Sequence, residues 1–272
     1  MSTHKSDSGA VTVAWLRRMK RDGIRITSLT AYDAAFAALV DAAGIDLVLV
    51  GDSLGMVVQG LETTVPVTME DMIYHARLVR RGLRRAMLMV DMPFMSYATP
   101  EEALRNGARL MKEAGAEIIK LEWGAAQEDT VHRLAKCGIP VCAHLGLQPQ
   151  SVHKLGGYRV QGRDEATAAR MLEDARTLEQ AGADILLLEC VPTVLARRIV
   201  EAVRIPVIGI GAGPFCDGQI LVLYDILDIA PGKRSRFSEN FMAGADSIQA
   251  AVAAYVQQVR DGEFPRAEHS FE

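Results

Sequence analysis

The sequence repeats one unit, a short aliphatic run that ends in a residue with a polar and mostly ionisable side chain. In the clearest copy, the run 47–50 (Leu-Val-Leu-Val) leads into Gly51, Asp52 and Ser53. Consecutive aliphatic residues are typical of a strand that is buried on both faces, as in a parallel sheet. Further runs end in the same way, at Asp91, Glu122, His144 and Glu189. The repeat therefore predicts a parallel sheet with chemically active side chains along one edge.

A second repeat marks the connections between these runs. The tetrapeptides 43–46, 114–117 and 181–184 all read Ala-Gly, then Ile or Ala, then an acid, and each directly precedes an aliphatic run. Glycine at this position ends a helix and turns the chain back toward the sheet. We expect strands at 24–29, 47–50, 87–90, 118–121, 141–143, 185–188 and 207–210, and an eighth within 220–228. We expect helices between these strands and a final helix at 238–260.

The number of these units defines the fold class. About eight strand–helix units of this spacing favour an α/β fold of the (β/α)8 TIM-barrel type over an open, doubly wound sheet. A Rossmann sheet is also disfavoured because no GxGxxG motif follows the first strand. We predict a single barrel domain over residues 11–272, with an extra N-terminal helix at 11–20, and a disordered tail at 1–10.

Composition excludes several classes of partner. A net charge of −4 gives no electrostatic reason to expect nucleic acid or an anionic membrane surface. No apolar run approaches the roughly 20 residues of a membrane-spanning helix, and residues 1–10 lack the apolar core of a signal peptide. The four cysteines show no CxxC pairing, so we expect reduced thiols in the core of a cytoplasmic protein.

Three acids follow different strands and should meet at one rim of the barrel. Residues just past the strands of a TIM barrel line the face that holds its active site, so Asp52, Asp91 and Glu122 are expected to converge. Crowded carboxylates repel one another unless a cation lies between them, and a set of oxygen ligands suits Mg²⁺. The alternative is that each acid caps a helix or pairs with a nearby base. We favour the metal site.

Other polar residues are candidates for substrate binding and proton transfer. Lys120 lies on the same strand face as Glu122, and an interior lysine is costly unless it is paired or faces an anionic ligand. Ser53 offers a hydroxyl and an N–H suited to a substrate carboxylate. Glu189 ends a long aliphatic strand and suits the role of general base. His144 is a candidate for proton transfer or substrate binding, and a purely structural histidine is the alternative.

Several motifs together point to a known family. They are LTAYD at 29–33, VGDSLG at 50–55, DMPF at 91–94, KLE at 120–122, HLGL at 144–147, GIGAG at 209–213 and CDGQ at 216–219. From about Val11 to the C-terminus, the sequence resembles the ketopantoate hydroxymethyltransferase (3-methyl-2-oxobutanoate hydroxymethyltransferase) family of pantothenate biosynthesis. Single motifs of this set are common, but their order along the chain is specific.

The resemblance implies a reaction and a set of ligands. The reaction transfers a hydroxymethyl group from 5,10-methylenetetrahydrofolate to 3-methyl-2-oxobutanoate through a metal-bound enolate, and the product is 2-dehydropantoate. Matching positions imply Mg²⁺ in each subunit at Asp52, Asp91 and Glu122, and a proton acceptor at Glu189. They imply keto-acid contacts from Asp52, Ser53, Asp91 and Lys120. The family also implies a cytoplasmic homo-oligomer, typically a decamer, whose partners are small molecules and not nucleic acid or membrane.

One departure from the family pattern concerns the site, and two other functions stay open. Trp123 stands directly after Glu122, where the family usually has glycine, so we expect its indole to narrow the site. The first alternative is a Mg²⁺-dependent lyase or mutase of the phosphoenolpyruvate/pyruvate barrel type, which needs no folate. The second is a non-catalytic ligand-binding barrel, in which Glu189 would be expendable.

Overall fold

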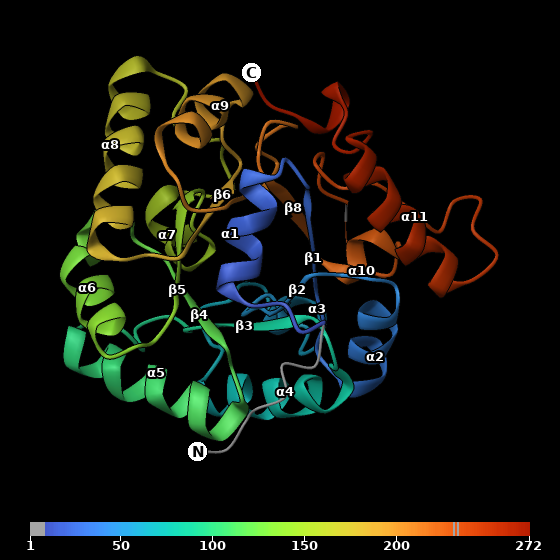
Figure 1. Ribbon diagram of the computed structural model, residues 1–272, viewed down its shortest axis with the longest axis horizontal. Helices are drawn as coiled ribbons and strands as arrows, with labels where there is room; N and C mark the ends of the chain where they lie inside the picture. Colours follow the sequence, from blue (N-terminus) through green and yellow to red (C-terminus); the bar gives the residue numbers. More distant parts are fainter. Residues whose placement is uncertain (1–8, 231, 233) are drawn as a thin grey trace.

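The fold is a closed barrel of parallel strands surrounded by helices (Figure 1). The computed structural model describes residues 9–230, 232 and 234–272. Strand order around the barrel follows the chain, and β8 closes it by pairing with β1, with Gly218 opposite Ile26. The strands are Ile26–Thr30 (β1), Leu47–Val50 (β2), Met87–Asp91 (β3), Ile118–Leu121 (β4), Val141–Gly146 (β5), Ile185–Glu189 (β6), Val207–Ile210 (β7) and Gly218–Leu221 (β8). The predicted (β/α)8 barrel is confirmed. Residues 1–8 of the predicted tail lie outside the described residues.

Helices form the outer layer (Figure 1). The longer ones are α2 (Ala34–Ala42), α4 (Met69–Gly82), α5 (Pro100–Ala114), α6 (Glu128–Lys136), α8 (Glu165–Ala181), α9 (Thr193–Ala202) and α11 (Ile248–Asp261). Short ones lie in the connections: α3 (Leu54–Val57), α7 (Val152–Leu155) and α10 (Leu223–Ile226), and the 3₁₀ turns η1 (Gly124–Gln127) and η2 (Pro149–Ser151). A third 3₁₀ turn, η3 (Ala267–His269), follows α11. The helix-ending role predicted for glycine is seen at Gly115 and Gly182, which have φ of 76° and 108°. Only glycine adopts this left-handed conformation at little cost.

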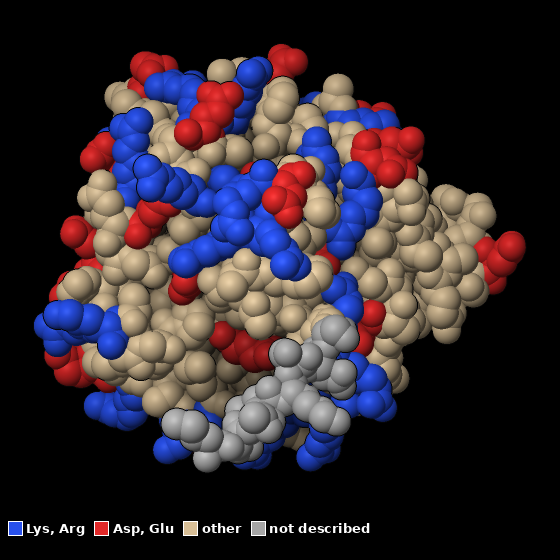
Figure 2. Space-filling model, viewed as in Figure 1, with Lys and Arg blue, Asp and Glu red and all other residues tan. Residues whose placement is uncertain are grey.

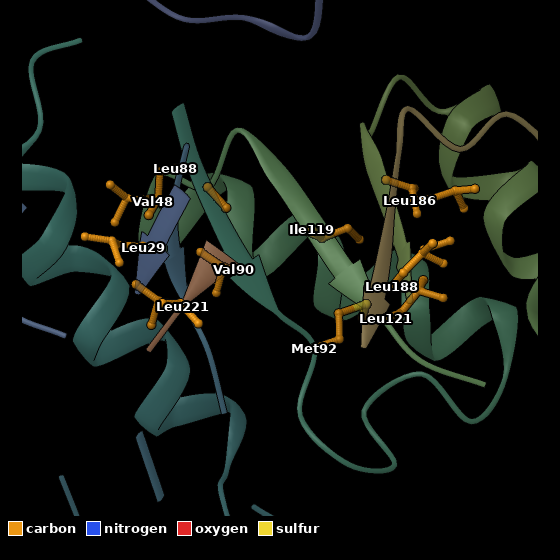
Figure 3. Close-up of a cluster of buried hydrophobic side chains, with 14 of the residues drawn as sticks. Leu29, Val48, Leu88, Val90, Met92, Ile119, Leu121, Leu186, Leu188 and Leu221 are labelled. Atoms are coloured by element: carbon orange, nitrogen blue, oxygen red, sulfur yellow. The ribbon is translucent and has the colours of Figure 1, made fainter. Parts of the chain in front are cut away.

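Strand side chains alternate between two apolar layers, because successive residues of a strand point to opposite faces. The outer layer packs against the helices and includes Val48, Val90 and Leu188 (Figure 3). The inner layer fills the barrel and includes Leu47, Met89, Ile118, Cys142 and Leu187. This alternation determines which polar residues at the strand ends face the barrel axis.

The extra N-terminal helix, α1 (Val13–Arg21), closes one end of the barrel (Figure 1). Leu16 and Met19 of α1 are buried and belong to the same cluster as the inner strand residues. Lys and Arg side chains gather over this helix on the surface (Figure 2), and two of them, Arg17 and Lys20, are paired with Asp184 and Asp217. This end of the barrel is therefore plugged and basic, and the opposite end is where the acidic strand-end residues lie.

Several predicted boundaries were wrong. The eighth strand lies at 218–221, and residues 223–226 of the expected stretch form α10 instead. A side chain at Gly218 would collide with the backbone of Ile26, so glycine starts β8 because β1 approaches closely there. The final helix begins at Ile248, where Ser247 caps it. Part of the stretch expected to be helical forms a turn instead, in which the side chain of Asn240 accepts hydrogen bonds from the N–H groups of Met242 and Ala243. The first strand begins later than predicted, at Ile26.

β5 also differs from the prediction. It continues to Gly146 because its pairing with β6 extends to Gly146 and Glu189, so His144 lies inside the strand.

The cysteines and the membrane prediction can be checked directly. The four cysteines are free thiols, and Cys142, Cys190 and Cys216 are buried as expected. Cys137 is exposed, contrary to the prediction, because it follows the last residue of α6 on the surface. Within the described part of the chain, the structure has no helix of the length and apolarity needed to cross a membrane.

Candidate active site

Strand alternation brings the predicted site residues to the inner face of the barrel. For four of the site residues, the residue two positions earlier on the same strand belongs to the inner apolar cluster. These pairs are Met89 and Asp91, Ile118 and Lys120, Cys142 and His144, and Leu187 and Glu189. The strand register then places residues of neighbouring strands side by side: Asp91 of β3 and Lys120 of β4 are Cα partners. The same pattern that makes the strands apolar therefore directs their polar ends toward one point.

These residues line one cavity of about 680 Å³, a size typical of small-molecule sites. All the side chains predicted for the site take part: Asp52, Ser53, Asp91, Lys120, Glu122, His144 and Glu189. The remaining wall is largely apolar and comes from strand residues such as Leu187 and from the connections after the strands, including Met56, Leu61, Tyr158 and Phe237. The structure thus brings together every residue that the sequence indicated, while their individual roles stay predictions.

A buried cluster of charges forms the floor of the cavity. Asp52, Asp91, Lys120 and Glu122 are each at most 5% exposed, and Lys120 Nζ lies 2.9 Å from Asp91 Oδ1. Burial, together with the charges of Asp91 and Glu122, raises the pKa of Asp52 to about 8. Burial alone would lower the pKa of Lys120, but the three surrounding carboxylates outweigh it and the pKa is raised. Lys120 is therefore held as a cation among the acids.

One oxygen of each acid is fixed by an N–H donor. The backbone N–H of Asp52 donates to Asp91 Oδ2 (3.0 Å), and that of Gln150 donates to Glu122 Oε2 (3.2 Å). The side chain of Gln150 holds Asp52 Oδ2 (2.9 Å). Among the described residues, the other oxygen of Glu122, Oε1, is buried and has no hydrogen-bond partner. Each acid is thus held at one oxygen by an N–H donor, and Asp91 is held at its other oxygen by Lys120.

His144 connects the acidic cluster to Glu189. Its Nε2 lies 3.3 Å from Glu189 Oε2, and its Nδ1 lies 3.6 Å from Glu122 Oε1. Burial and the neighbouring Lys120 both lower the pKa of His144, but its contacts with Glu122 and Glu189 outweigh them, so the pKa is raised. The imidazole is 1% exposed. This position favours a role of His144 in proton transfer or substrate binding over a purely structural one.

Two residues of the site were missed by the sequence analysis. Gln150 lies in η2 and Tyr97 lies in the loop after β3, and both are at most 2% exposed. Tyr97 Oη donates to Gln150 Oε1 and accepts a hydrogen bond from the N–H of Glu122 (3.2 Å). The only signal for Gln150 was the length of its connection, 145–163, since long connections are usually functional.

The prediction that Trp123 narrows the site was wrong. The described residues that line the cavity do not include it. Its indole packs instead against Tyr97, with ring centroids 4.6 Å apart, and against Phe94. The backbone of Trp123 is left-handed, with φ of 80°. The indole thus supports Tyr97 and leaves the cavity open.

Comparison with known proteins establishes the family. The family model described as ketopantoate hydroxymethyltransferase matches residues 10–267. The chain belongs to this family. It is 66% identical over 261 residues to the 3-methyl-2-oxobutanoate hydroxymethyltransferase of Alkalilimnicola ehrlichii, covering 96% of this chain and 94% of the relative. It is 58% identical to the enzyme of the same name from Nitrosococcus oceani, covering 97% and 100%. The family indicated by the sequence motifs, and with it the prediction of a transferase, are confirmed.

Solved structures share the barrel at low sequence identity. A putative phosphonomutase from Burkholderia cenocepacia superposes with a TM-score of 0.62 at 20% identity, covering 80% of this chain and 95% of that one. A 2,3-dimethylmalate lyase of the PEP mutase/isocitrate lyase superfamily superposes with a TM-score of 0.58 at 17% identity, covering 78% and 81%. At these identities the likeness shows a common fold only.

Proposed function

We propose that this protein transfers a hydroxymethyl group from 5,10-methylenetetrahydrofolate to 3-methyl-2-oxobutanoate and so forms 2-dehydropantoate in the cytoplasm. The observation that carries the proposal is the convergence of acids, a lysine and a histidine from five strand ends on one cavity. The relatives that match nearly the whole chain are named for this reaction. The apolar upper wall of the cavity offers space for a larger co-substrate beside a small keto acid.

The charge of the cluster supports a divalent cation as the cofactor. The carboxylates of Asp52, Asp91 and Glu122 outnumber the single ammonium of Lys120, so the ionised cluster carries an excess of two negative charges, which one Mg²⁺ balances. Their oxygens are of the kind that Mg²⁺ prefers. Glu122 Oε1 has no hydrogen-bond partner among the described residues, although His144 Nδ1 lies 3.6 Å from it, and it would serve as one ligand. Among the described residues, no three acidic, histidine or cysteine side chains are close enough together to hold a metal ion as they stand. The ammonium of Lys120 supplies the positive charge beside Asp91.

The residues around this point divide the remaining work. When bound, Mg²⁺ would act as a Lewis acid toward the keto oxygen and acidify the neighbouring C3–H. Ser53 offers its hydroxyl and N–H to the substrate carboxylate. Glu189 accepts the C3 proton, and His144, 3.3 Å away, orients its carboxylate. Lys120 stabilises the negative charge that develops on the substrate. C3 then forms a bond to the methylene carbon of the folate, both C–N bonds of that carbon break, and water supplies the hydroxyl oxygen. Tetrahydrofolate leaves with its two nitrogens protonated, and the two protons balance the one lost from C3 and the one lost from water.

The experiment that tests the proposal follows the C3–H signal of 3-methyl-2-oxobutanoate by NMR in D₂O. We expect the signal to disappear only when both the protein and Mg²⁺ are present. Added methylenetetrahydrofolate should then yield 2-dehydropantoate. Asp52→Ala and Asp91→Ala should abolish both. Exchange without any folate-dependent product would favour a lyase or mutase. Metal binding without exchange or product would favour a ligand-binding barrel.

The proposal includes a homo-oligomer, specifically a decamer, as in the family that the motifs resemble. Light scattering coupled to size exclusion measures this directly, with an expected mass ten times the 29.6 kDa of one chain. A monomer of unchanged activity would contradict it.

A further inference from the structure

The connection after β5 reaches across the barrel and holds two of the acids from outside the strands. Gln150 lies in η2, far along the chain from Asp52, yet its side-chain Nε2 donates to Asp52 Oδ2 (2.9 Å). The same amide nitrogen donates to the backbone oxygen of Met92 (2.9 Å). Its backbone N–H donates to Glu122 Oε2 (3.2 Å). One residue therefore contacts the groups that follow β2, β3 and β4.

The orientation of the Gln150 amide is fixed by its partners. The N–H of Glu122 can only donate, so Tyr97 Oη accepts from it (3.2 Å) and must direct its own proton to Gln150 Oε1. At the other end, the carbonyl of Met92 can only accept. The amide oxygen therefore faces Tyr97, and both amide hydrogens are used on Met92 and Asp52. A flipped amide would place its oxygen against the carboxylate and the carbonyl.

This arrangement sorts the oxygens of the acids. Gln150 occupies one oxygen of Asp52 and one of Glu122, both from the side of the loop. The remaining oxygens are Asp52 Oδ1 and Glu122 Oε1, and among the described residues Oε1 is buried without a hydrogen-bond partner. Outer residues that hydrogen-bond to ligating side chains fix their orientation and tune their affinity for a metal ion.

We propose that Gln150 is a positioning residue, which through its link to Tyr97 fixes the carboxylates of Asp52 and Glu122 in one geometry for a divalent cation. The inference rests on the proposed function, since it needs a cation at these acids. It assigns a role in the site to the loop after β5, in addition to the strand ends.

The test measures Mn²⁺ binding from the EPR signal of the free ion. Gln150→Met keeps the volume of the side chain and the backbone N–H that holds Glu122, but removes the amide that holds Asp52. Tyr97→Phe keeps the ring and removes only the hydroxyl. The control is Gln219→Met, since Gln219 is also 2% exposed and donates to a backbone oxygen, that of Gly213, away from the acids.

The expected result separates positioning from packing. Outer partners of metal ligands are typically worth about 10–100-fold in affinity, so the Kd for Mn²⁺ should rise by that factor in Gln150→Met. It should rise less in Tyr97→Phe and stay within about twofold in Gln219→Met. The double variant Gln150→Met/Tyr97→Phe should lose less affinity than the product of the two single losses, because Tyr97 acts in part through Gln150.

Three outcomes would overturn the inference. The first is wild-type Mn²⁺ affinity in Gln150→Met, and the second is an equal loss in Gln219→Met, which would indicate a general packing effect. Should Gln150→Met not fold, Tyr97→Phe decides, and unchanged affinity in that variant is the third. Wild-type protein that binds no Mn²⁺ would instead refute the metal step of the proposed function.

Discussion

The variant Lys120→Met tests whether the carboxylates that surround the buried ammonium of Lys120 also bind a divalent cation. Lys120 Nζ lies 2.9 Å from Asp91 Oδ1, and neither side chain is more than 5% exposed. Removing one partner of a buried ion pair typically costs about 3–5 kcal/mol, because the other charge is left uncompensated. For a chain of this size, 1 kcal/mol corresponds to roughly 2–4 °C in Tm. We therefore expect the metal-free variant to melt about 10 °C below the wild type.

Added Mg²⁺ should recover much of this loss. A ligand present at about 100 times its Kd stabilises the folded state by about 2.7 kcal/mol. The gain should be larger in Lys120→Met than in the wild type, because the ion supplies the charge that the substitution removed. Differential scanning calorimetry with and without Mg²⁺ measures both effects.

The matched control for this prediction is Lys20→Met. Lys20 Nζ also lies 2.9 Å from a carboxylate, that of Asp217, but at the plugged end of the barrel. Its variant should lose stability, and its gain from Mg²⁺ should not exceed that of the wild type. An equal extra gain in both variants would refute the reasoning, as would a Lys120→Met protein that melts at the wild-type temperature.

Three further predictions concern the base, a buried acid and the aromatic support. Glu189→Gln should slow C3–H exchange by at least about 100-fold while the keto acid still binds, as NMR line broadening would report, and wild-type exchange would exclude Glu189 as the base. Burial outweighs the nearby Arg234 and raises the pKa of Asp225 from 3.8 to about 6. The contribution of Asp225 to the free energy of unfolding is therefore greatest below pH 3.8, the pKa in the unfolded chain, and is lost as the pH rises through 6. Asp225→Asn should therefore stabilise the fold by at most about 3 kcal/mol at pH 7 and hardly at all at a pH below 3.8, as urea unfolding would measure, and an equal gain at both pH values would contradict the shift. Trp123→Gly should lower Tm, because the lost packing on Tyr97 outweighs the relieved backbone strain, and should leave the KM for the keto acid unchanged, whereas a lower KM would mean that the indole does narrow the site.

The strand ends of the site could be predicted from sequence because a single rule governs them. Successive residues of a strand point to opposite faces, so a residue two positions after an inner apolar residue also points into the barrel. Asp91, Lys120 and Glu189 follow this rule, and closure of the barrel then brings their strands together. The rule needs only the local sequence and the fold class.

The boundary errors have a different cause. Gly218 begins β8 because β1 approaches it too closely for a side chain, and this contact joins the two ends of the barrel sequence. Ile220 and Leu221 continue the strand, but the apolar residues after them form α10. Local composition does not distinguish a strand from a short helix over so few residues. Only the pairing of distant segments determines where β8 lies.

Gln150 and Tyr97 show what no periodic pattern reveals. Both lie in connections, where side chains do not alternate between two faces as they do along a strand. Each forms hydrogen bonds with a residue that follows another strand, Tyr97 with Glu122 and Gln150 with Asp52. Gln150 contacts Asp52 only because the loop after β5 folds over the mouth of β2 to β4. A carboxylate at a strand end can be identified from its own strand, but the donor that fixes its second oxygen is defined by contacts between loops. The reactive groups of such a site are thus encoded locally, and their geometry depends on tertiary contacts.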